Sequence, residues 1–376
     1  MLITDQELGR TSGDGTFAFR HFPQLDGLRG VAILLVIFCH VLQFGSGMHV
    51  GGSGGIGGLG VLLFFVLSGF LITGLLDREK HQAGRISLSG FYIRRVLRLF
   101  PALFCFLAVL CLLIVLGIVT DTSWRTVAAC LLYIRNMRGQ GLSTSHIWSL
   151  SIEEQFYLFW PCIMRGVNRA VALRIAVVGV LAVSVFRMVG IKLEWSPYNL
   201  GAFYERSWYR FDSILIGCAI ALILSESANL GKLRAYLSGI ALPLLVWPAI
   251  LVWTKYGESV TQVWYLTVQM ILAGLILLNL ILGRESPYLR AFCHPIAGWS
   301  GRISYSWYLW QQLFTVFTSP PWLGLRIFPV NVAASLLLAV ASQRLIERPF
   351  LRMKDHLGQR GRQQSVANSC ATTLVQ

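Results

Sequence analysis

Arg29 and His40 bracket the first long apolar run of this sequence, Gly30–Cys39. Their spacing corresponds to about three helical turns, so both side chains lie on one stripe of a helix, about 16 Å apart along its axis. An ionisable group that deep in a membrane is costly to keep and is therefore a candidate functional group. His40 is thus a candidate base or nucleophile, and a neutral histidine that only bonds a neighbouring helix is the alternative.

The fourth apolar segment contains two adjacent carboxylates, Glu153 and Glu154. A buried carboxylate must be paired, hydrogen-bonded or protonated. Ser149 and Tyr157 lie one turn before and after Glu153, whereas leucines occupy those positions around Glu154. We therefore expect Glu153 to face the interior, where it would orient His40 and hold its tautomer, as the acid does in a hydrolase triad. A purely structural hydrogen bond is the alternative.

A cluster of cations precedes the third apolar segment, in the string FYIRRVLRLFP. Arg95 and Arg98 are three residues apart and share a helical face, a geometry suited to holding the phosphates of a cytosolic ligand. Cationic flanks are also ordinary in cytoplasmic loops, where they only set topology.

Further polar residues lie within or beside apolar segments. Arg210 and Asp212 follow one another closely in RSWYRFDSILIGC, and the string SYSWYLWQQ runs from Ser304 to Gln312. Arg210 can instead extend its charge to the membrane surface, and tyrosines are also typical of the interface. The residues that we expect to line a substrate cavity are Ser68, Tyr157, Arg210, Asp212 and Tyr305.

The composition predicts the fold class. The chain is 55% hydrophobic and 13% charged, with a mean hydropathy of +0.62, which is typical of an all-α polytopic membrane helix bundle. The first and ninth apolar segments are too short for a simple span, which suggests tilted or broken helices around a cavity. About ten apolar segments are predicted: 30–45, 59–76, 99–119, 147–164, 171–190, 209–224, 235–253, 263–282, 303–318 and 327–346.

The net charge of +15 is an orientation signal. In a soluble protein it would suggest nucleic acid, but here most cations lie in alternate short connections, which predicts that both termini are cytoplasmic. We therefore expect the lipid bilayer as a partner and no nucleic acid. The expected organisation is a cytoplasmic segment (1–29), a membrane domain (30–347) and a basic, disordered cytoplasmic tail (348–376).

Two sequence features do not support the binding sites that they would otherwise suggest. The glycine-rich run 45–60 matches the dinucleotide pattern G-x-G-x-x-G, but it follows no strand, so a flexible cap over an extracytoplasmic opening or a plain linker is the better interpretation. The eight cysteines are scattered without a C-x-x-C pair. We therefore expect no metal site, no disulfide and no tightly bound cofactor.

Seven strings together resemble the acyltransferase 3 family of bacterial membrane proteins, in the family's order and across nearly the whole chain. The resemblance implies a membrane enzyme of the inner membrane that moves an acyl group, usually acetyl from cytosolic acetyl-CoA, to a hydroxyl of a carbohydrate, a lipid-linked saccharide or another envelope-linked or secreted acceptor. These strings are LDGLRGVAILLVIFCH, FFVLSGFLIT, FYIRRVLRLFPAL, WSLSIEEQFYLFWP, YRFDSILIGC, SYSWYLWQQ and ERPF.

The resemblance also assigns roles to single residues. His40 matches the catalytic histidine, and Arg29 matches the arginine of the family's Arg-x10-His motif. Arg95 and Arg98 match the family's Arg-x-x-Arg motif, which is associated with acyl-CoA use. Glu153 matches the acid of its W-S-L-x-x-E string. Gln311 departs from the pattern, since many members have histidine there. The chain resembles the stand-alone subgroup, which has no appended hydrolase-like domain.

Residues and resemblance suggest one mechanism. Acyl-CoA would place its phosphates on Arg95 and Arg98 and its thioester at His40, which would act as general base or become transiently acylated while Glu153 orients it. A secondary transporter of a small solute or saccharide is the competing class, because it too places ionisable groups inside a helix bundle. The acceptor and the length of the acyl chain stay open.

Overall fold

The computed structural model describes residues 21–42, 56–138, 140–192, 205–226, 264–283, 286–316 and 327–353, together with residues 235, 324 and 325. In these residues the chain is helical and has no strand, which confirms the predicted all-α bundle. The predicted seventh apolar segment, the region of the glycine-rich run at 43–55 and the tail from residue 354 lie outside the described residues.

The long helices are α1 (Pro23–His40), α2 (Ile56–Ala83), α3 (Leu88–Val115), α6 (Ile147–Gly166), α7 (Arg169–Lys192), α9 (Phe211–Glu226), α12 (Trp264–Leu282), α14 (Pro295–Val316) and α15 (Val330–Ser342). The short ones are α4 (Trp124–Leu131), α5 (Arg135–Arg138), α13 (Pro287–Phe292), and the 3-10 turns η2 (Leu142–Thr144) and η3 (Ser207–Tyr209). A π-helical turn, η5 (Gln343–Glu347), continues α15, and the helix then runs on to Met353. The described helix therefore passes the predicted domain boundary at 347.

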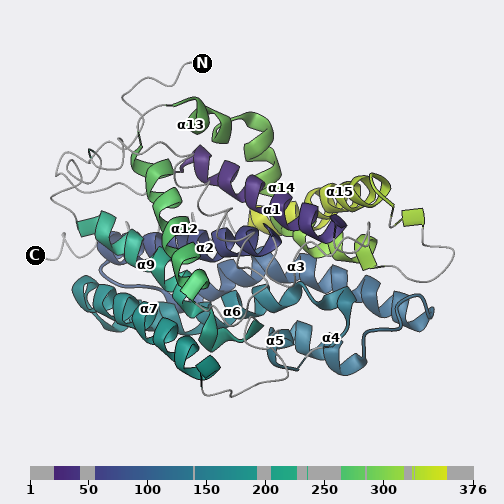
Figure 1. Ribbon diagram of the computed structural model, residues 1–376, viewed down its shortest axis with the longest axis horizontal. Coiled ribbons are helices and arrows are strands. Elements are labelled where there is room, and N and C mark those ends of the chain that lie inside the picture. Colours follow the sequence, from purple (N-terminus) through teal and green to yellow (C-terminus); the bar gives the residue numbers. More distant parts are fainter. Residues whose placement is uncertain are drawn as a thin grey trace, which may run out of the picture.

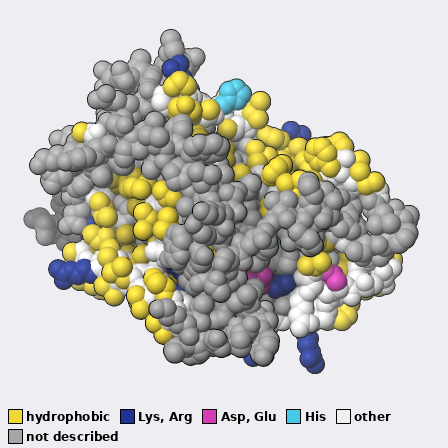
Figure 2. All heavy atoms as spheres, in the orientation of Figure 1, with side chains coloured by type: hydrophobic (Ala, Val, Ile, Leu, Met, Phe, Trp, Pro, Cys, Tyr) yellow, Lys and Arg dark blue, Asp and Glu magenta, His cyan; other side chains and the backbone are white. Residues whose placement is uncertain are grey.

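Six described helices are long and apolar enough to cross a membrane. Their lipid-facing character is visible on α7, where Val178, Leu181 and Val185 are 62%, 60% and 55% exposed. Figure 2 shows hydrophobic side chains over much of the described surface on the face that it presents. Such a surface is stable only in a membrane. The six spans are 23–40, 57–83, 88–115, 169–190, 265–282 and 330–353.

The two helices predicted to be short are continuous. α1 begins at Pro23, with Asp26 in its first turn, and α14 begins at Pro295. Proline fits the first turn of a helix, and an acidic residue there is favoured by the helix dipole. The hydropathy pattern missed these starts because their first turns are polar, so the suggestion of broken helices in the first and ninth segments was wrong.

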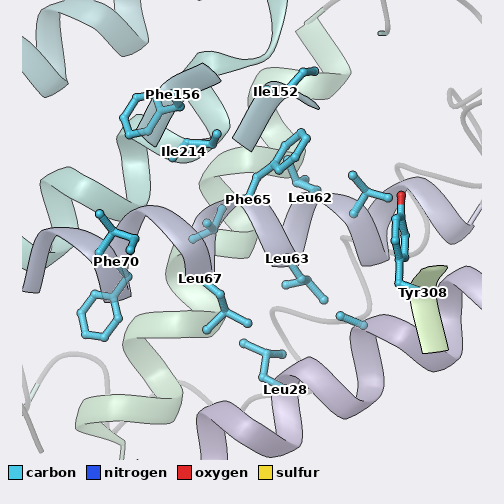
Figure 3. Close-up of a cluster of buried hydrophobic side chains, with 14 of the residues drawn as sticks. Leu28, Leu62, Leu63, Phe65, Leu67, Phe70, Ile152, Phe156, Ile214 and Tyr308 are labelled. Carbon is cyan, nitrogen blue, oxygen red and sulfur yellow. The ribbon is translucent and has the colours of Figure 1, made fainter. Parts of the chain in front are cut away.

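Helix α2 lies at the centre of the bundle (Figure 1). It packs against α1 and α9, while α14 packs against α1 and α15, and α7 covers α9. Figure 3 shows the resulting core: on α2, Phe65 points toward Ile152 of α6, and Leu63 and Leu67 point toward Leu28 of α1. One helix therefore brings the α1 and α6 sides of the molecule together.

The approach of α2 to α9 depends on two glycines. A Cβ atom on Gly69 would lie 1.9 Å from the carbonyl oxygen of Ile214, and a Cβ atom on Gly217 would lie 2.0 Å from that of Val66. Both distances are far inside van der Waals contact with backbone atoms that cannot turn away. The two backbones therefore cross at a distance that only small residues permit.

The Gly69→Ala variant should be destabilised, by about 1–3 kcal/mol or more, because an overpacked contact forces α2 and α9 apart. Thermal unfolding of the detergent-purified protein measures this. Gly166→Ala is the matched control, since a Cβ atom there would meet nothing within 4 Å. Equal unfolding temperatures for the two variants would contradict the close crossing.

The end of α6 is held to α2 by charged side chains. The Lys80 ammonium donates to the carbonyl oxygens of Met164 (2.8 Å) and Val167 (2.6 Å). Arg169, at the start of α7, makes a bidentate pair with Asp77 at 3.1 and 2.9 Å. Cations satisfy the open carbonyls at a helix C-terminus, so these contacts fix the position of α6 beside α2.

Candidate active site

A cavity of about 260 Å³ lies among α1, α2, α3, α6 and α14. Along α2 its wall runs from Val61 to Leu75, which is about 21 Å at 1.5 Å per residue. The predicted residues that line it are Arg29, Ser68, Arg95, Arg98, Glu153, Tyr157 and Tyr305. The tertiary structure thus brings together most of the side chains that the sequence singles out.

The three arginines face this cavity but differ in their partners. Arg95 makes an ion pair with Glu154 at 3.0 Å, and its guanidinium carbon lies 3.5 Å from the centroid of the Tyr157 ring. Within the described part of the chain, no carboxylate lies within 4 Å of Arg29 or Arg98. Asp26 and Glu153 line the same cavity, but the charges of Arg29 and Arg98 are not engaged in an ion pair with a described carboxylate.

Glu153 lies on the wall of the cavity. Its Oε1 accepts a hydrogen bond of 2.8 Å from the Ser68 hydroxyl. Glu154, which we did not expect to face the interior, lines the same cavity. Both carboxylates reach it because Glu153 faces α2 and Glu154 faces α3.

Gln311 occupies the position beside His40 that the sequence suggested for Glu153. The Nδ1 atom of His40 lies 3.0 Å from Gln311 Oε1. Gln311 Nε2 donates to Gln312 Oε1 at 3.3 Å, and Gln312 Nε2 donates to the Leu142 carbonyl oxygen at 3.0 Å. These bonds orient both amides so that the Gln311 oxygen faces His40. Because that oxygen can only accept, Nδ1 of His40 carries the proton and Nε2 is the acceptor nitrogen.

His40 itself does not line the cavity. The cavity reaches Tyr308 on α14, and Gln311, which bonds His40, lies one turn further along the same helix. The Tyr308 hydroxyl lies 2.6 Å from the Ser149 hydroxyl and donates to the His146 carbonyl oxygen at 2.8 Å. In Figure 3, Tyr308 stands beside the core residues of α2. Tyr308 is therefore the cavity residue that lies one helical turn before the partner of His40.

His146 is a residue that sequence reasoning missed. It is 2% exposed, and its ring packs edge to face against Tyr308 (5.4 Å between centroids) and Phe106 (5.7 Å). It lies near His40. The spacing of His146, Ser149 and Glu153 along one helical stripe is the signal that could have found it.

Tyr305 lines the cavity as predicted, whereas Arg210 and Asp212 do not. The Tyr305 hydroxyl donates to the Leu99 carbonyl oxygen at 2.8 Å. Asp212 makes a buried ion pair of 2.8 Å with Arg187 of α7, and Arg210 lies over the Phe65 ring at 5.6 Å. The local sequence did not reveal that the partner of Asp212 comes from α7.

Comparison with known proteins adds independent findings. The model of the acyltransferase domain family matches residues 22–342. A protein of Staphylococcus aureus (strain COL), provisionally named an O-acetyltransferase, is 28% identical over 365 residues, covering 88% of this chain and 57% of that protein. YrhL of Bacillus subtilis (strain 168), provisionally named a peptidoglycan O-acetyltransferase, is 27% identical over 369 residues, covering 88% and 55%.

The peptidoglycan O-acetyltransferase OatA of Listeria monocytogenes (strain ATCC BAA-679 / EGD-e) is 27% identical over 365 residues, covering 89% of this chain and 56% of that protein. The chain therefore spans a little over half the length of these relatives. No solved structure matches it.

Proposed function

The chain belongs to the acyltransferase 3 family, and on this premise we propose that it transfers an acetyl group from cytosolic acetyl-CoA to a hydroxyl of an envelope carbohydrate. The observation that carries this proposal is the cavity that begins at three arginines and reaches Tyr308, one helical turn from Gln311, the hydrogen-bond partner of His40. Relatives named for peptidoglycan O-acetylation support a carbohydrate acceptor.

The charged end of the cavity suits the donor. Arginine binds phosphate through several N–H groups in a fixed geometry, and the positive charge of Arg29 and Arg98 is not neutralised by a described carboxylate within 4 Å. The pantetheine arm would then follow α2 past Ser68 and Glu153 toward Tyr308. In this arrangement Glu153 borders the donor, and Gln311 is the residue that orients His40.

The histidine end suits proton transfer. With Nδ1–H donated to Gln311, the Nε2 lone pair of His40 can take the proton from the acceptor hydroxyl as its oxygen attacks the thioester carbonyl. The C–S bond then breaks, and the CoA thiolate receives that proton. Transient acylation of Nε2 is the other route, and an acyl-histidine trapped after mixing enzyme with acetyl-CoA alone would establish it.

The same proposal fixes the orientation in the membrane. Both termini would lie on the cytoplasmic side of the inner membrane, because the connections richest in Lys and Arg are retained there. The arginines would then open toward cytosolic acetyl-CoA, and His40 would lie toward the extracytoplasmic side. Cysteine labelling from either side of intact cells tests this arrangement.

Mass spectrometry of envelope and secreted glycans tests the function. Cells that carry the wild type should show acetylated glycans, whereas cells with a deletion or with His40→Ala should lack the mass of that acetyl group. Loss of the mark in both strains would also name the acceptor. Uptake of an unmodified saccharide into vesicles, with no consumption of labelled acetyl-CoA, would instead support a transporter.

A further inference from the structure

Arg95 is already engaged on two sides. Its Nε and Nη2 atoms both donate to Glu154 Oε1, at 3.1 and 3.0 Å, and its guanidinium stacks on Tyr157 at 3.5 Å. The side chains of Arg95 and Glu154 are only 14% and 17% exposed. A charge-assisted pair with so little solvent is much stronger than a surface pair, so the charge of Arg95 is largely neutralised within the wall.

Arg29 and Arg98 are in the opposite situation. Both line the cavity, yet in the described ranges neither has a carboxylate within 4 Å. Arg98 is exposed and Arg29 is half-buried, so both guanidinium groups are accessible from the cavity. A multiply charged anion in the cavity would pair with both charges.

We propose that Glu154 divides the arginines into two roles: it makes Arg95 a neutralised part of the cavity wall and leaves Arg29 and Arg98 as the pair that binds the phosphates of acyl-CoA. Glu154 is therefore a positioning residue that sets the net charge of the donor site. This inference rests on the proposed function, since acyl-CoA is the donor in both.

The division predicts opposite effects for the two partners of the ion pair. Arg95→Gln leaves the Glu154 carboxylate uncompensated beside the phosphates, which should weaken CoA binding. Glu154→Gln frees the charge of Arg95, which should strengthen it. When both are replaced, the pair is lost without a change in net charge, so binding should return close to the wild-type value.

Titration calorimetry of CoA binding to the purified, full-length protein tests this double-mutant cycle. We expect Arg98→Gln to weaken binding about 10-fold or more, because it removes a charge-assisted contact with the phosphates. Arg95→Gln should weaken binding to a similar extent, because it leaves the charge of Glu154 uncompensated beside them. Glu154→Gln should bind at least as tightly as the wild type, and the double variant R95Q/E154Q should bind within about 3-fold of it. Thermal unfolding confirms that each variant is folded.

Two results would overturn the inference. If R95Q/E154Q binds CoA as weakly as Arg95→Gln, then Arg95 contacts the phosphates directly. If Arg95→Gln binds like the wild type, then Glu154 does not influence the donor site. Both differ from failure of the proposed function itself, which would appear as no CoA binding by the wild-type protein.

Discussion

His40→Ala should lower the rate of acetyl transfer by about 10²–10⁴-fold, the contribution of a general base, and by more if His40 carries the acyl group. The reason is that Nε2 is the nitrogen that accepts a proton when Nδ1–H is donated to Gln311. Release of CoA from acetyl-CoA by purified protein with an added saccharide acceptor measures the loss.

His81→Ala is the matched control for this variant. His81 lies in the last turn of α2, is exposed and does not line the cavity, so its removal should leave the rate unchanged. CoA binding should persist in His40→Ala, because the arginines are untouched. A His40→Ala protein that folds and still transfers acetyl at a near-normal rate would refute both the general-base route and the acyl-histidine route.

Gln311→Leu should lower kcat by about 10²-fold or more, because without the amide oxygen the imidazole can adopt the tautomer with its proton on Nε2. The acceptor side chain of Gln311 is itself held by Gln312, which is fully buried. Since neither glutamine lines the donor cavity, KM for acetyl-CoA should change little. A steady-state comparison of kcat and KM separates these effects.

Gln311→Glu distinguishes orientation from packing. A carboxylate of the same shape also accepts the Nδ1 proton, so this variant should retain far more activity than Gln311→Leu. If both variants lose activity equally, the hydrogen bond between Gln311 and His40 does not set the tautomer. A changed pH profile of kcat in Gln311→Glu alone would show that the residue acts through His40.

Local sequence patterns were sufficient to identify the charged residues that interrupt apolar helices. Arg29, Arg95, Arg98 and Glu153 are costly in a membrane, so each is conspicuous in a hydropathy pattern, and all four line one cavity. The same patterns failed to identify polar residues at positions where polar residues are common. The first turns of α1 and α14 were missed, and Gln312, which touches the site only through other residues, carries no signal of its own.

The sequence by itself determined the helical membrane fold and the identity of the ionisable groups, because both follow from the cost of placing polar groups in lipid. Only the tertiary structure decided their partners. It paired Glu154 with Arg95, Gln311 with His40 and Asp212 with Arg187. Each pair joins different helices, and such contacts depend on how whole helices pack, which the periodicity of one helix does not contain.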